Sequence, residues 1–194
     1  FKQFKSFIKS NKFKLILDGA NILFFGERKI TFNSYIRLNL IIEKIIKKNK
    51  KEKVLLIIHQ RHVDFLNKNF SKEKAGKILE MIKKWKQNII IYFTPYKMND
   101  DWFILYASIQ NKNSRVISND LFRDHKFQIS EEIDFEDIFN KWSENNKITF
   151  DFENKKYNAK NLKLVYPLEY SLRVQKNNLS YHIPSNNNEW ICIN

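Results

Sequence analysis

The sequence predicts an α/β domain with a central, mainly parallel β-sheet flanked by helices, followed by a small β-rich appendage. Short apolar runs alternate with longer segments of helical periodicity over residues 13–146. Apolar residues make up 43% of the 194 residues, which is enough to build one core. From residue 147 to 194, strand-like pieces separated by Asn-rich and Pro-containing turns replace this alternation.

Four short, mainly apolar runs are typical of strands buried on both faces of a parallel sheet. These runs are residues 13–17, 53–58, 88–93 and 114–118. Segments of helical spacing are residues 31–48, 61–69, 71–86, 99–111, 120–127 and 134–145. The appendage is expected to form strands at "KITFDF", "LKLVY", "YSLRVQ", "LSYHIP" and "EWICIN".

The first twelve residues, "FKQFKSFIKSNK", have helical periodicity. Phe1, Phe4, Phe7 and Ile8 fall on one face, with lysines on the other. We expect residues 1–12 to be the end of a truncated helical segment that precedes the α/β domain.

The net charge of +14 favours a polyanionic partner, with nucleic acid ahead of an acidic membrane. The alternative is a solvated lysine-rich surface encoded by an AT-biased genome. No apolar run approaches the roughly 20 residues of a membrane span. The single cysteine excludes an intrachain disulfide and is compatible with a reducing, intracellular compartment. Three glycines leave neither a dinucleotide fingerprint nor a P-loop.

Acidic residues follow three of the four predicted strands. Asp18 ends the first run in "LILDGAN", Asp100 and Asp101 begin the helix after the third, and Asp120 follows the fourth in "ISND", with Asp124 one turn further. Ligands of an open parallel sheet bind beyond the carboxyl ends of its strands. Taken singly, each acid is explained as a turn residue, a helix cap or a partner of a helix dipole.

Taken together, neighbouring carboxylates repel one another unless a cation neutralises them. Hard oxygen ligands of this kind suit Mg²⁺ or Mn²⁺ better than zinc. A magnesium site on a strongly basic domain indicates phosphodiester hydrolysis, with the metal activating water and the lysines holding the phosphate backbone.

Six segments resemble, in order and spacing, the metallonuclease (NYN, PIN-like) domain of protein-only RNase P. They are "LDGANI" (17–22), "YFTPYKMNDDWFILYA" (92–107), "SNDLFRDH" (118–125), "YPLEYSLRVQ" (166–175), "YHIP" (181–184) and "WIC" (190–192). The resemblance implies a PIN-like domain at residues 13–146. It also implies Mg²⁺-dependent endonucleolytic removal of the 5′ leader from precursor tRNA in a mitochondrion, a plastid or the nucleus.

The resemblance also assigns residues to the site. The metal-site aspartates of the family fall on Asp18, Asp100, Asp101 and Asp120. Asp124 and His125 match the motif as groups that surround the metal or orient the substrate, and Asn21, Arg123 and Lys97 are expected to contact RNA. For His125 the alternative is a hydrogen-bonded histidine at the sheet edge, and for Arg123 it is an ion pair with a site acid.

His182 and Cys192 by themselves indicate an ordinary core histidine and core cysteine, because a structural zinc site needs four ligands. In the family, these motif positions supply half of a structural zinc site, and a preceding Cys-x-x-Cys supplies the rest. The resemblance therefore implies half a zinc site, unoccupied or weakly occupied in this chain. It also implies, as a partner, an upstream pentatricopeptide-repeat region of the same protein or an accessory protein.

Two other functions are compatible with these patterns. One is a PIN-like nuclease with another RNA or flap substrate, which "NDDW", "YHIP" and "WIC" argue against. The other is a basic RNA-binding module without catalysis, which the presence of all four acids disfavours.

Overall fold

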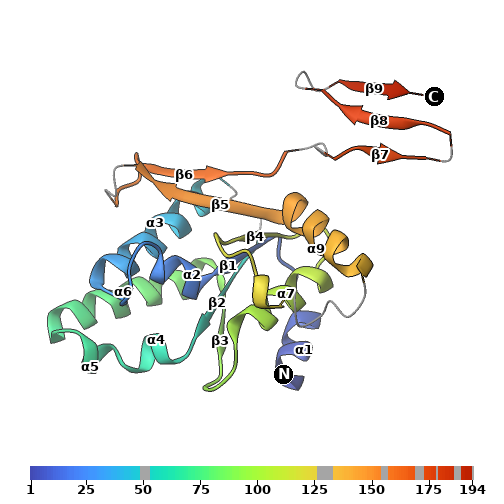
Figure 1. Ribbon diagram of the computed structural model, residues 1–194. Helices are drawn as coiled ribbons and strands as arrows, with labels where there is room; N and C mark the ends of the chain where they lie inside the picture. The colour runs from blue at the N-terminus through green and yellow to red at the C-terminus, as the bar shows by residue number, and fades with distance from the viewer. Residues whose placement is uncertain are drawn as a thin grey trace.

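A six-stranded sheet forms the centre of the molecule (Figure 1). The computed structural model describes residues 1–48, 53–125, 133–153, 157–168, 173–177, 179–185 and 189–193. The strand order is β3-β2-β1-β4-β5-β6, parallel throughout except for the antiparallel pair β5-β6. The strands are β1 (Leu15–Asp18), β2 (Val54–His59), β3 (Ile90–Thr94), β4 (Arg115–Ile117), β5 (Lys147–Phe152) and β6 (Leu162–Val165). The predicted α/β class is confirmed.

Helices cover both faces of this sheet (Figure 1). One face carries α2 (Gly19–Phe24), α3 (Phe32–Lys48) and α6 (Lys72–Asn88), and the other carries α1 (Lys2–Ser10), α7 (Asp100–Gln110) and α9 (Ile133–Asn146). Two short helices, α4 (Arg61–Asp64) and α5 (Leu66–Asn69), connect β2 to α6. The helix expected at residues 120–127 is helical at 123–125, and its last two residues lie outside the described ranges.

Strand β2 shows why the apolar runs of this sequence have no polar alternation. Val54, Leu56 and Ile58 point into the core beneath α3 and α6, whereas Leu55 and Ile57 point into the core beneath α7. Both sets are buried, so every position contributes roughly 1.5–3 kcal/mol of hydrophobic burial. A continuous apolar run is therefore what two covered faces require.

The division expected near residue 146 does not coincide with a break in the sheet. β5 and β6, which the sequence assigned to the appendage, join the main sheet through β4. Alternate residues Ile148, Phe150 and Phe152 are buried in the core beneath α3. An alternating strand needs one covered face, and the central domain provides it.

The separate β-rich part is a three-stranded antiparallel sheet (Figure 1). It consists of β7 (Gln175–Lys176), β8 (Tyr181–Pro184) and β9 (Trp190–Ile193). The first part of the expected strand "YSLRVQ" lies outside the described ranges.

The N-terminal helix α1 packs on the central domain. Phe4 and Ile8 are buried, and the Phe4 ring lies 4.8 Å from Phe103 on α7 and 4.5 Å from Tyr92 on β3. The amphipathic pattern of residues 1–12 is therefore satisfied by the α/β core itself. Among the described residues, no helix combines the length and the apolar character needed to cross a membrane.

Helix α2 follows Asp18 directly and was not predicted, because six residues are too few to show a helical period. Its first residue, Gly19, lies against β2. A Cβ added to Gly19 would stand 2.6 Å from the carbonyl oxygen of Ile57 and 2.8 Å from the Cβ of Ile58. Only glycine lets α2 start this close to the sheet.

We expect Gly19→Ala to lower the free energy of unfolding by about 1–3 kcal/mol, because a backbone carbonyl has to move. Gly76→Ala is the matched control, since nothing lies within 4 Å of a Cβ added in the middle of α6. That variant should gain roughly 0.5–1 kcal/mol from helix propensity. Urea unfolding followed by circular dichroism measures both changes, and an unchanged midpoint for Gly19→Ala would contradict the close contact.

Candidate active site

Polar side chains form a row at the carboxyl ends of the central strands, on the face that α7 covers. Side chains alternate along a strand, and Ile16, Ile57 and Val116 point toward α7. Two residues later the same alternation places Asp18, His59 and Ser118 on that face. Thr94, at the end of β3, is paired in register with His59. The row therefore follows from strand periodicity.

The centre of the row lies where the strand order reverses. From β1 the chain builds β2 and β3 on one side, and then β4, β5 and β6 on the other. Such a switch point is where open α/β sheets bind ligands. The acidic residues singled out in the sequence lie at this edge of the sheet.

Ser118 joins the two acids of the switch point. Its hydroxyl donates to Oδ2 of Asp18 at 2.8 Å and accepts from the backbone N–H of Asp120 at 3.0 Å. The side chain is fully buried. Sequence reasoning missed Ser118, although its place two residues after the apolar Val116 in "VISND" was a usable signal.

Asn21 and Asn119 fix the loop after β4. The backbone N–H of Asn119 donates to Oδ1 of Asn21 at 2.9 Å. The Asn119 amide also donates to the carbonyl of Phe150 at 2.8 Å and accepts from the Phe150 N–H at 3.0 Å. Asn21, expected to contact RNA, thus also holds the loop that carries Asp120.

Asp100 and Asp101 begin α7 but point to different partners, because successive helical residues are rotated by about 100°. Asn99 caps the helix by accepting from the Asp101 N–H at 2.9 Å. Asp100 is buried and accepts a hydrogen bond from the Thr94 hydroxyl. Asp101 contacts His125 Nε2 through Oδ2 at 2.7 Å.

His125 lies buried at the edge of the site. Its ring packs 4.6 Å from that of Trp102, and its Nδ1 has no hydrogen-bond partner among the described residues. A neutral ring protonated at Nε2 can donate to Asp101 and leaves no proton on Nδ1 to be satisfied. The pairing with Asp101 matches the alternative of a hydrogen-bonded histidine at the sheet edge.

Three of the acids influence one another electrostatically. Burial raises the pKa of Asp18 to about 7; hydrogen bonds from Asn21 and Ser118 oppose this rise, while the charges of Asp101 and Asp120 add to it. Burial is also the main cause that raises the pKa values of Asp100 and Asp101.

Lys147, which the sequence analysis did not single out, is a half-buried cation near Asp120. Its Nζ donates to the backbone carbonyl of Asp120 at 2.8 Å. Burial lowers the pKa of this ammonium, and the charge of Asp120 raises it. Lys147 reaches Asp120 because it is the first residue of β5 and pairs with Val116 of β4, four residues before Asp120.

An open cleft lies over this group. Asp101, Asp120 and Asn21 line it, together with residues 121–125 and Asn119. Asp124 and Arg123 are exposed there. Asp18 and Asp100 are buried and do not line it, and Lys97 is exposed in the turn before α7 without lining it. The expected residues thus divide into cleft-lining and supporting positions.

The carboxylates of Asp18, Asp101 and Asp120 have the charge that a divalent cation needs, but they do not converge on one point. Throughout the described ranges, no three Asp, Glu, His or Cys side chains stand close enough together to hold one metal ion. The mutual repulsion of Asp18, Asp101 and Asp120 is nevertheless what a hard cation would relieve, and carboxylate oxygens suit Mg²⁺ or Mn²⁺. Holding an ion would require these side chains to turn toward it.

His182 and Cys192 do come together. They face each other in the β8-β9 register, and Nδ1 of the histidine lies 3.1 Å from Sγ of the cysteine. Both side chains are accessible rather than core residues, which corrects the alternative of a core pair. Two ligands are half of a tetrahedral zinc set, and no zinc site is complete among the described residues.

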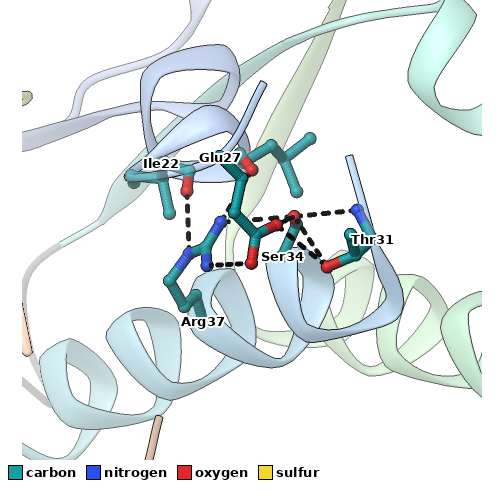
Figure 2. Close-up of polar contacts among 6 residues, drawn as sticks. Ile22, Glu27, Thr31, Ser34 and Arg37 are labelled. Atoms are coloured by element: carbon teal, nitrogen blue, oxygen red, sulfur yellow. Dashed lines mark hydrogen bonds and ion pairs between the residues drawn. The ribbon is translucent and has the colours of Figure 1, made fainter. Parts of the chain in front are cut away.

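Helix α2, which is capped by Asp18, is held at its other end by Arg37 (Figure 2). Arg37 is fully buried; its Nε donates to the Ile22 carbonyl at 3.3 Å, and its Nη2 donates to the Leu23 carbonyl at 2.9 Å. Both carbonyls lie in the last turn of the helix, where helical N–H partners run out, and that of Ile22 also accepts the Phe25 N–H at 3.4 Å. The guanidinium therefore satisfies them and fixes α2 to α3.

Glu27 neutralises this buried cation (Figure 2). Its Oε1 accepts from Arg37 Nη1 at 3.3 Å, and its Oε2 accepts from Thr31 and Ser34 at 2.9 and 3.1 Å. Burial alone would raise the pKa of Glu27, but the hydrogen bonds from Thr31, Arg37 and Ser34 outweigh it and lower the pKa. Both ends of α2 are thus tied by polar contacts.

The raised pKa of Asp18 makes stability depend on pH. The folded-state pKa of about 7 lies above the ordinary value of 3.8, so the folded protein loses stability as pH rises between these values. We expect Asp18→Asn to gain a few kcal/mol at about pH 8 in EDTA, and nothing at about pH 3. Urea unfolding with Asp124→Asn as the exposed control measures this. An equal gain at both pH values would contradict it.

Comparison with known proteins identifies the family. The family model of protein-only RNase P matches residues 1–192. Proteinaceous RNase P 2 of Arabidopsis thaliana is 28% identical over 204 residues, which cover 100% of this chain and 36% of that protein. Proteinaceous RNase P 1, chloroplastic/mitochondrial, of the same plant is 26% identical over 202 residues, which cover 99% of this chain and 32% of that protein.

A solved structure supports the same family. The crystal structure of nuclear proteinaceous RNase P 2 (PRORP2) from A. thaliana matches with a TM-score of 0.72 and 26% identity, over 99% of this chain and 40% of that one. The chain thus spans about a third of the length of the curated relatives it matches. Since the family model extends over both sheets and the acidic cleft, the chain belongs to the protein-only RNase P family.

Proposed function

We propose that the chain is the catalytic part of a metal-dependent endoribonuclease that removes the 5′ leader of precursor tRNA. The observation that carries this proposal is the acidic switch point, where Asp101 and Asp120 line an open cleft and both repel the buried Asp18. Membership of the protein-only RNase P family supports the reaction class. The excess of basic residues, +14 in total, suits an RNA substrate.

In this proposal Asp18, Asp100, Asp101 and Asp120 hold one or more Mg²⁺ or Mn²⁺ ions. When bound, such an ion supplies a Lewis acid for the phosphodiester and for water. Ser118 keeps Asp18 and Asp120 in place, and His125 does the same for Asp101. Arg123 and Lys97 are exposed and available to contact phosphate oxygens, and Asp124 is available to orient the substrate in the cleft.

The RNA-binding partner region, the zinc site and the location of the protein are proposed on the same basis. An RNA-binding region elsewhere in the same protein, or an accessory protein, would grip the tRNA body. The half zinc site at His182 and Cys192 would be completed by two further ligands. The relatives carry the words nuclear and chloroplastic/mitochondrial in their names, so a nucleus, plastid or mitochondrion is the proposed location.

Incubation of a 5′-extended precursor tRNA with the chain, with Mg²⁺ or with chelator, tests the proposal. Cleavage mapped to the leader junction, dependent on the metal and leaving a 5′-phosphate, supports it. Metal-dependent cleavage elsewhere in the RNA would favour a PIN-like nuclease with another substrate. RNA binding without cleavage, even when the upstream part of the protein is supplied, would favour a non-catalytic module.

Asp101→Asn should reduce cleavage by orders of magnitude and leave RNA affinity nearly unchanged. The substitution removes a carboxylate proposed to hold the metal and removes no contact to phosphate. Glu80→Gln, which makes the same charge change at an exposed position on α6, is the control. Single-turnover cleavage and fluorescence anisotropy separate the two effects, and cleavage at the wild-type rate would refute the assignment.

Mg²⁺ should raise the melting temperature, because an ion that binds only the folded chain stabilises it by mass action. The shift should grow as pH rises through about 7, since the proton on Asp18 competes with the cation. Thermal scans at millimolar Mg²⁺ below and above that pH measure this. A shift that is independent of pH, or is retained in Asp101→Asn, would place the bound ion elsewhere.

A further inference from the structure

Five aromatic rings form a continuous strip at the carboxyl ends of β2 and β3. We call it the ring strip: Phe24, His62, His59, Tyr96 and Phe65, each in contact with the next. The centroid distances along the strip are 5.8, 6.0, 5.7 and 6.2 Å. The two histidines are buried, whereas Phe24, Tyr96 and Phe65 are 38%, 47% and 43% exposed. Neither the sheet nor the cleft chemistry requires exposed rings here.

Tyr96 is held in place by polar contacts. Its hydroxyl donates to Oδ2 of Asp64 at 2.8 Å, and Oδ1 of Asp64 accepts from the Gln60 amide at 2.7 Å. His59 in turn accepts the Arg61 N–H at Nδ1 at 3.1 Å. A half-exposed ring that is already fixed loses little entropy when another flat group stacks on it.

The charges around the ring strip favour an anion. Arg61, Lys68 and Lys97 are exposed, and Lys68 Nζ lies 6.0 Å from the centre of the Phe65 ring. Two acids lie nearby: Asp100 is buried beside Thr94, and Asp64 is exposed, with its two oxygens engaged by Tyr96 and Gln60. Fixed rings among lysine and arginine are what single-stranded nucleic acid binds, because bases stack and phosphates pair with cations.

The ring strip is continuous with the acidic site. Asp100 is the first residue of α7, and Asp101 is the next. His59 and Thr94 pair in register, and Thr94 donates to Asp100. An RNA strand that crosses the acidic cleft can therefore extend onto the rings.

We propose that the ring strip binds the unpaired nucleotides of the 5′ leader by base stacking; this rests on the proposed function. In the acceptor stem both faces of each base are covered by neighbouring base pairs, so a stacking surface suits the unpaired side of the cut. Tyr96 and Phe65 are positioning residues for the leader, and they take no part in the bond cleavage.

The test compares precursor tRNAs with a long leader and with a single-nucleotide leader. Tyr96→Ala and Phe65→Ala should each weaken binding of the long-leader RNA by roughly 5- to 100-fold, the effect of losing one stacked base. Binding of the single-nucleotide-leader RNA should change little. Tyr96→Phe should retain the wild-type preference, because the ring remains. Fluorescence anisotropy in Ca²⁺ measures binding without cleavage.

Tyr181→Ala is the matched control, since Tyr181 is also 47% exposed but lies on β8. Unchanged leader dependence in both Tyr96→Ala and Phe65→Ala, each shown to be folded by its melting curve, would overturn the proposal. The proposal would also be overturned if the binding defect of these variants depended on the unpaired 3′ end of the RNA and not on the leader. If the chain cleaves the leader and the ring variants have no effect, only the role of the ring strip is refuted. If the ring variants weaken RNA binding but the chain does not cleave the leader, only the proposed function is refuted.

Discussion

β1 and β4 lie side by side although Asp18 and Ser118 are 100 residues apart in the chain, and the site depends on this pairing. The chain leaves β1 in one direction to build β2 and β3, and returns to build β4 against the free side of β1. This return brings the Ser118 hydroxyl to the buried carboxylate of Asp18. Without it, Asp18 would keep its burial and lose the partner that offsets part of the cost.

Burying the acids of the site lowers the stability of the fold, and the surrounding residues hold these acids in place. Asp18 is buried with its pKa raised to about 7, and Asp100 and Asp101 are shifted in the same direction. Backbone and side-chain contacts nevertheless fix each acid: the start of α2 for Asp18, Thr94 for Asp100 and His125 for Asp101. Sites of this kind commonly trade stability for function.

The charged groups near the switch point lie at different depths. Acids gather at the switch point, whereas the cations next to it, Lys97 and Arg123, are exposed. The ring strip extends this surface toward β3. The three-stranded sheet carries the His182–Cys192 pair, so the two proposed metal sites belong to different sheets.

The sequence by itself determined the α/β class, the four parallel strands, most helices and the edge at which the acids lie, because these follow from periodicity and from the rule for strand ends. It also contained the family motifs. Tertiary structure alone decided that β5 and β6 extend the main sheet, since one buried face does not say which core buries it. It also decided that Asp100 and Asp101 point to different partners and that Ser118, Asn119 and Lys147 support the site. These contacts join residues far apart in the chain, and no local pattern specifies which distant strand end lies beside which.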